Sequence, residues 1–104
     1  MKHITEIIHK INHPAGYEDA EEDVEHLKNS GDSISIRLAK LMGEYIRLNN
    51  EFRTPGMKKN MDLTKRKSEL KEFFAELSYE LLHTKCLDPY LLVDRAMKKL
   101  NSRT

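Results

Sequence analysis

Two pairs of potential metal ligands have spacings that place both members on one face of a helix. His9 and His13 are four residues apart, and His83 and Cys86 are three apart. Four such ligands would suit a tetrahedral zinc ion. However, His13 precedes Pro14, and the residue before a proline leaves the helical conformation. Because nothing in the sequence joins the two pairs, we predict surface histidines, a structural cysteine and no bound metal or other cofactor.

Carboxylates one helical turn apart offer a second kind of chemistry. Glu44 is followed later in the chain by a ladder of glutamates at Glu69, Glu72, Glu76 and Glu80. Carboxylate oxygens are ligands that Mg²⁺ prefers, and a helical set could hold the ion for pyrophosphate cleavage. The sequence contains no glycine-rich phosphate loop, since its four glycines are isolated from one another.

In its C-terminal two-thirds, this layout of helices is similar to that of the all-helical nucleotide pyrophosphohydrolases of the MazG-like family. That family carries Glu-x-x-Glu on one helix and Glu-x-x-Asp on the next. Here Glu44 has Leu41 and Arg47 three residues to either side, and on the second helix no aspartate follows Glu69, Glu72 or Glu76 at a distance of three residues. The resemblance would imply a divergent metal-dependent hydrolase that uses Glu44, Glu72 and Glu76. Taken by itself, such a ladder is typical of a solvated helix face.

Charge is divided between two segments of opposite sign. Residues 17–28 contain six acids and one base, and residues 53–71 contain seven bases and two acids but no aromatic side chain for stacking on a nucleic-acid base. The basic segment predicts a contact surface for a protein partner or, alternatively, for nucleic-acid phosphates. The two segments could also pair with each other, within one chain or between subunits. The predicted basic surface consists of Lys58, Lys59, Lys65, Arg66 and Lys67.

Helical periodicity runs through nearly the whole chain, and strand alternation is never sustained. Long amphipathic helices are predicted over 33–53 and 62–85, separated by a Thr-Pro-Gly break. A short connection between long helices predicts an antiparallel hairpin. Short helices are predicted at 3–12, 89–101 and 17–28, the last with a mobile acidic linker as its alternative. The predicted fold class is therefore all-α, a small helical bundle built on the hairpin with short flanking helices.

The chain is predicted to form one domain over 1–104, with short helices in 1–31, the hairpin in 32–86 and the last helix in 87–104. Only 38% of its 104 residues are hydrophobic, so its core is thin. Apolar residues of 33–53 form a seam with alternating spacings of four and three. We therefore predict a homo-oligomer in which a second subunit completes the burial. The predicted oligomer interface consists of Leu38, Leu41, Tyr45 and Leu48.

The single cysteine, the charge-interrupted N-terminal segment and the lack of a long apolar window predict a cytoplasmic protein without a membrane segment. With no cofactor motif, the leading hypothesis is a non-enzymatic regulatory or adaptor protein. It would act by protein–protein interaction as a homo-oligomer, a type found among phage and mobile-element accessory factors. The alternatives are a nucleic-acid-binding accessory protein that uses residues 58–71, and the pyrophosphohydrolase described above.

Overall fold

A computed structural model describes residues 3–53, 61–83 and 88–102, and every regular element in these ranges is a helix. The all-α fold class is therefore confirmed. The predicted bounds of 33–53 match the observed helix, and the other predicted ends that fall on described residues differ from the observed ones by at most three residues. The predicted end at residue 85 lies outside the described residues. The helices are α1 (Ile4–Asn12), α2 (Ala20–Lys28), α3 (Ser33–Arg53), α4 (Met61–His83) and α5 (Pro89–Ser102).

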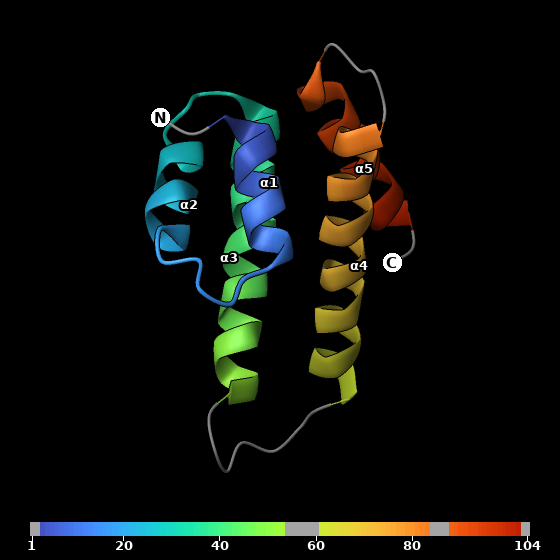
Figure 1. Cartoon of the computed structure of the whole chain (residues 1–104). Helices are drawn as coiled ribbons and strands as arrows, with labels where there is room; N and C mark the ends of the chain where they lie inside the picture. Colours follow the sequence, from blue (N-terminus) through green and yellow to red (C-terminus); the bar gives the residue numbers. More distant parts are fainter. Residues whose placement is uncertain (1–2, 54–60, 84–87, 103–104) are drawn as a thin grey trace.

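The two long helices, α3 and α4, lie side by side and run in opposite directions (Figure 1). α1 packs against α4 and also contacts α5. α5 returns along the upper part of α4 and contacts α3 as well. α2 packs on α3, on the side away from α4 (Figure 1). The bundle therefore has α2 at one side and α4 at the other.

One apolar cluster contains buried residues from all five helices. Phe74 of α4 is fully buried within it, and its ring lies 5.4 Å from that of Tyr45 on α3 and 4.9 Å from that of Phe73, centroid to centroid. β-Branched residues are modest helix formers, so the isoleucine-rich α1 depends on packing to remain helical. All four of its isoleucines are buried, which supplies that packing.

Two aspartates fix the starts of helices. The Asp32 carboxylate accepts hydrogen bonds from the backbone N–H groups of Ile34 and Ser35, at 3.3 Å each, and from the Ser35 hydroxyl at 3.0 Å. Asp88 accepts from the N–H of Tyr90 at 3.0 Å. These contacts satisfy N–H groups that have no partner within the first turn of a helix. They explain why α3 and α5 begin where the cap signals predict.

The acidic segment is ordered as a helix, but that helix starts later than predicted. α2 begins at Ala20 and not at residue 17. The preceding residues form turns, and Gly16 adopts a φ of 81°, a left-handed conformation that favours glycine. Tyr17 therefore lies outside the helix, and its hydroxyl donates a hydrogen bond to the carboxylate of the buried Asp23.

Candidate functional site

Only part of the predicted basic surface is exposed on the described residues. Lys58 and Lys59 lie outside the described residues. Lys65 is exposed on α4, and Lys67 is half-buried. Arg66 makes a two-pronged contact with Glu44 on α3, with Nε 2.5 Å from Oε1 and Nη2 3.2 Å from Oε2.

This contact commits the charge of Arg66 to the α3–α4 interface. Its Nη1 atom also lies 3.6 Å from a carboxylate oxygen of Glu69, one turn further along α4. The hydrogen bonds that Arg66 donates to the Glu44 carboxylate are the main cause that raises the pKa of the Arg66 guanidinium. Two parallel N–H···O bonds also add geometric specificity to the pair. Arg66 therefore joins two helices within the chain and contributes little to an open basic surface.

The carboxylates that the hydrolase alternative requires are not brought together. Glu44 is held by Arg66, while Glu72 and Glu76 are exposed on α4. Over the residues that the structure describes, no group of three or more His, Cys, Asp or Glu side chains could hold a metal ion. A magnesium ion needs several oxygen ligands in close geometry. The arrangement of the described residues therefore does not supply the predicted magnesium set.

The three potential zinc ligands that the structure describes are likewise dispersed. His9 Nδ1 lies 2.5 Å from the hydroxyl of the buried Ser78, so it links α1 to α4. His13 is exposed at the end of α1. The imidazole of His83 packs against the ring of Tyr79, with 4.2 Å between centroids. Cys86 lies outside the described residues.

The predicted oligomer seam lies in the chain's own core. Leu38, Tyr45 and Leu48 are buried, and Leu41 is half-buried against the same cluster. An amphipathic spacing shows that a face is covered, but it does not show which element covers it. Here other helices of the chain cover it, so these three buried residues offer no exposed apolar surface to a second copy. Self-association through them would require the bundle to open.

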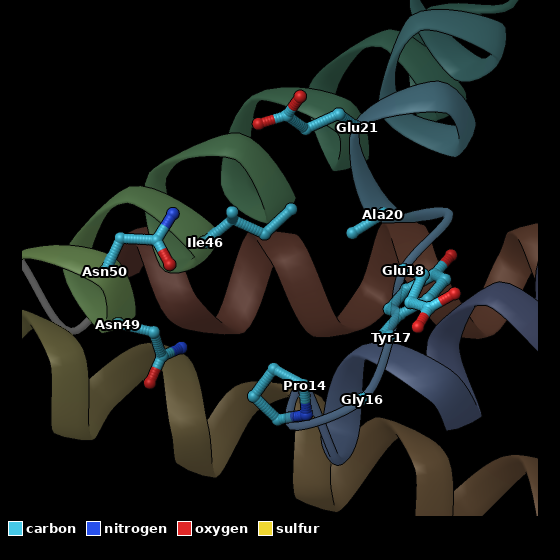
Figure 2. A pocket seen from close by; sticks show the side chains of 9 residues that line it. All are labelled: Pro14, Gly16, Tyr17, Glu18, Ala20, Glu21, Ile46, Asn49 and Asn50. Atoms are coloured by element: carbon cyan, nitrogen blue, oxygen red, sulfur yellow. The ribbon is translucent and has the colours of Figure 1, made fainter. Parts of the chain in front are cut away.

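The structure instead places two adjoining hollows between α2, the preceding turn and α3. The first has a volume of about 270 Å³ (Figure 2). We call it the Ile46 pocket, and its lining residues are Pro14, Gly16, Tyr17, Glu18, Ala20, Glu21, Ile46, Asn49 and Asn50. The second, of about 560 Å³, shares three of those residues and continues along the two helices to Lys28 and Gly43. Together they form the α2–α3 groove.

The Ile46 pocket combines apolar walls with negative charge. Ala20 and Ile46 approach each other from α2 and α3 (Figure 2). Two exposed carboxylates, Glu18 and Glu21, are part of the lining, which contains no Lys, Arg or His. Asn49 donates a hydrogen bond to the backbone oxygen of Tyr45 at 3.0 Å, which fixes its side chain at the pocket. Apolar walls below carboxylates suit a long cationic side chain.

The rest of the α2–α3 groove carries a smaller net charge. On its α2 side, the Lys28 ammonium lies 3.6 Å from Glu25. On its α3 side, Arg47 lies 4.0 Å from Glu51. These exposed pairs neutralise most of the charge along the groove without adding much stability. Within the groove, the net negative charge is therefore larger at the Ile46 pocket. A neighbouring hollow that shares Glu18 is lined by Lys10, His9 and His13.

Sequence reasoning identified the acidic segment but not the pocket. The acids of residues 17–28 were visible as a charge cluster, and Glu18 and Glu21 belong to it. Asn49 and Asn50 gave no signal, because asparagines at the end of a helical pattern are unremarkable by type and spacing. The hollow depends on the turn that ends at Asp19, which only the folded chain reveals.

Comparisons of the chain with protein-family models, with curated proteins and with solved structures found no match. Within the part of the chain that the structure describes, no helix is both long enough and apolar enough to cross a bilayer.

Proposed function

We propose that this chain is a non-enzymatic regulatory or adaptor protein that binds a protein partner in the α2–α3 groove. The partner segment would place one arginine or lysine side chain in the Ile46 pocket. The observation that carries this proposal is a pocket with apolar walls and two exposed carboxylates, Glu18 and Glu21, but no basic group in its lining.

The size of the pocket supports a side chain as its occupant. Sites for small molecules usually have volumes of about 300–1,000 Å³ and enclose most of the ligand. The Ile46 pocket, at about 270 Å³, is smaller and opens into the longer groove. An arginine can bury its methylene stem against Ala20 and Ile46 while its guanidinium stays near carboxylates at the rim. The adjoining groove then has room for the residues that flank it.

The negative charge of the Ile46 pocket favours a protein partner over nucleic acid. Phosphates would be repelled by Glu18 and Glu21, whereas a basic peptide would be attracted. The nucleic-acid alternative relies on the basic surface of α4, from which Arg66 is withdrawn by its contact with Glu44. Lys65 remains exposed there. A steep loss of DNA or RNA affinity with added salt is the behaviour that would favour this alternative.

The test is a titration of ¹⁵N-labelled protein with a short peptide, followed by NMR. The probe is Gly-Ser-Arg-Ser-Gly, capped at both ends, and its control contains neutral citrulline in place of arginine. We expect the arginine peptide to shift the amide signals of Ala20, Ile46 and Asn50. We expect the citrulline peptide to bind up to about fivefold more weakly, the effect typical of an exposed ion pair.

Matched variants make the test specific to the pocket. Replacing Glu18→Gln and Glu21→Gln together should remove the preference for arginine over citrulline. Glu22→Gln is the control, because Glu22 is exposed on the same helix but does not line the pocket. If the arginine peptide shifts no signal at the pocket at millimolar concentration, or if Glu22→Gln has the same effect as the double variant, the proposed site is wrong.

A further inference from the structure

One face of α4 is exposed along the whole helix and has a regular spacing. Its members follow one another at alternating intervals of four and three residues, and every one of them is exposed. Intervals of this kind keep all members on one side of the helix, where the apolar ones can contribute to a helix–helix contact. We call this face the α4 outer stripe, which consists of Met61, Lys65, Ser68, Glu72, Ala75, Tyr79 and Leu82.

Both ends of the α4 outer stripe are apolar. Met61 is 87% exposed at one end, while Tyr79 and Leu82 are 64% and 68% exposed at the other. Three of the five large hydrophobic side chains exposed on the described surface therefore belong to this single stripe. Single exposed apolar residues are normal on a surface, but here Tyr79 and Leu82 adjoin each other on one helix face, and Met61 lies on the same face about 27 Å away.

The two halves of α4 carry opposite charge. Its first half, from Met61 to Lys71, exposes the two bases Lys65 and Lys71 and one acid, Asp62, while Arg66 is engaged by Glu44. Its second half, from Glu72 to His83, contains three glutamates and neither lysine nor arginine. Two copies of α4 in parallel would therefore bring like charges together. Two antiparallel copies would bring the basic half of each helix against the acidic half of the other.

We propose that the α4 outer stripe binds the same stripe of a second copy of this chain, as an antiparallel, two-fold symmetric helix pair. Met61 of one copy then lies beside Leu82 of the other, and Glu72 lies close to the two-fold axis. Each Lys71 lies near the carboxylate of the opposite Glu72. The same patch is used by both copies, so the contact closes after two subunits. A helix of 23 residues offers a contact roughly 35 Å long.

This dimer differs from an oligomer that forms through the seam of Leu38, Leu41, Tyr45 and Leu48, because that seam is covered within each chain. It also leaves the α2–α3 groove open, since α2 lies on the other side of α3 (Figure 1). The inference goes beyond the proposed function and uses a separate surface. Either proposal can therefore fail without the other.

The first test measures the solution mass and the dimer dissociation constant by sedimentation equilibrium. Leu82→Glu should raise that constant by at least about 30-fold, the factor that corresponds to the loss of an interface hot spot. Leu91→Glu is the matched control, because Leu91 is 59% exposed but belongs to α5. Circular dichroism checks that both variants keep the helicity of the parent. A parent that is monomeric at millimolar concentration, or equal effects of the two variants, would overturn the proposal.

The second test determines the direction of the helices with introduced cysteines, after Cys86→Ser removes the only native thiol. Glu72→Cys should form a disulfide-linked dimer on mild oxidation, since the two copies of residue 72 face each other near the axis. Tyr79→Cys alone should not, because its two copies would be roughly 20 Å apart along the helices, and a disulfide needs Cα atoms within about 7 Å. Mixing Tyr79→Cys with Lys65→Cys should restore the cross-link. Efficient self-linking of Tyr79→Cys would indicate a parallel pair and would refute the antiparallel contact.

Discussion

The two short helices α1 and α2 have the same length, nine residues, but are held in the bundle very differently. α1 buries four isoleucines and packs against α4 and α5. α2 buries smaller side chains, including Ala20 and Val24, and packs on α3 at the side of the bundle (Figure 1). Isolated helices this short are unstable in water, so each depends on its contacts. Both helices therefore contribute to the core, but α1 does so with four large side chains and α2 with smaller ones together with Leu27.

Charge increases the difference between the two helices. α2 carries exposed acids close together, and their mutual repulsion opposes the helix. Its one buried carboxylate, Asp23, accepts a hydrogen bond from the Tyr17 hydroxyl, so the turn before α2 also holds the helix in place. Elements with few apolar contacts open at lower free energy than the core. The wall of the α2–α3 groove is therefore the part of the bundle best able to adjust to a partner.

Truncation of one buried residue in each helix tests whether α1 and α2 contribute differently to stability. Ile8→Ala should lower the free energy of unfolding by about 2–5 kcal/mol, because Ile8 is fully buried in the core. Leu27→Ala should lie at or below the bottom of that range, since α2 can shift on α3 to fill the space. Urea denaturation followed by circular dichroism measures both changes.

Hydrogen exchange distinguishes local opening of α2 from unfolding of the whole bundle. Native-state hydrogen exchange should show that Leu27→Ala speeds exchange mainly in α2, whereas Ile8→Ala speeds it throughout the bundle. If Leu27→Ala destabilises every helix as strongly as Ile8→Ala does, then α2 unfolds together with the core. The contrast between the two helices would then be wrong.

Most of the fold could be predicted from the sequence, because helix ends and faces are local properties. The 4–3 spacing of apolar residues and the caps at Asp32 and Asp88 placed α3 and α5 within one residue of the observed bounds. α2 was predicted to start at residue 17, because acidic and apolar residues continue the helical pattern back to Tyr17. The left-handed turn at Gly16 and the bond from Tyr17 to Asp23 override that pattern.

The candidate site was less predictable, because it depends on contacts between residues far apart in sequence. Arg66 and Glu44 each looked like a member of a charged set, one for binding and one for catalysis. In the folded chain they neutralise each other across 22 positions of sequence. Likewise, Leu38 and Tyr45 were correctly predicted to lie on an apolar face. The periodicity could not show that this face is covered by the chain's own helices.

A second prediction uses two glycines that line the two hollows of the α2–α3 groove. Gly16 adopts a positive φ in the turn before α2, so Gly16→Ala should cost about 1–2 kcal/mol through backbone strain. Gly43 is helical, lines the groove and has open space where a Cβ would be added. Gly43→Ala should therefore stabilise the protein by roughly 0.5–1 kcal/mol.

Thermal unfolding of both variants under identical conditions checks these opposite signs. A Cβ added at either glycine has no neighbouring atom within 4 Å, so steric overlap does not contribute to the change in stability. A Gly16→Ala variant as stable as the parent would mean that the turn adopts another conformation. In that case, the left-handed turn at Gly16 would not be the reason why α2 begins at Ala20.

The smallest expected effect concerns the bond between Tyr17 and Asp23, which attaches α2 to the preceding turn. Tyr17→Phe should cost roughly 0.5–1.5 kcal/mol, the usual net contribution of one hydrogen bond. Burial and the neighbouring Asp23 carboxylate raise the pKa of the Tyr17 phenol above its ordinary value of 10.0. The folded state therefore favours the neutral phenol.

Because the pKa of Tyr17 is raised by folding, its contribution to stability is complete below about pH 10 and is lost as the pH rises above that value. The unfolding free energy of the parent should consequently fall more steeply between pH 9 and about pH 11 than that of Tyr17→Phe, which has no phenol to ionise at this position. The other three tyrosines are present in both proteins, so the difference between the two curves isolates Tyr17. Parallel curves would mean that the phenol is equally easy to ionise in the folded and unfolded chains. Tyr17 would then not hold α2 through its hydroxyl, and α2 would depend on its apolar contacts with α3 alone.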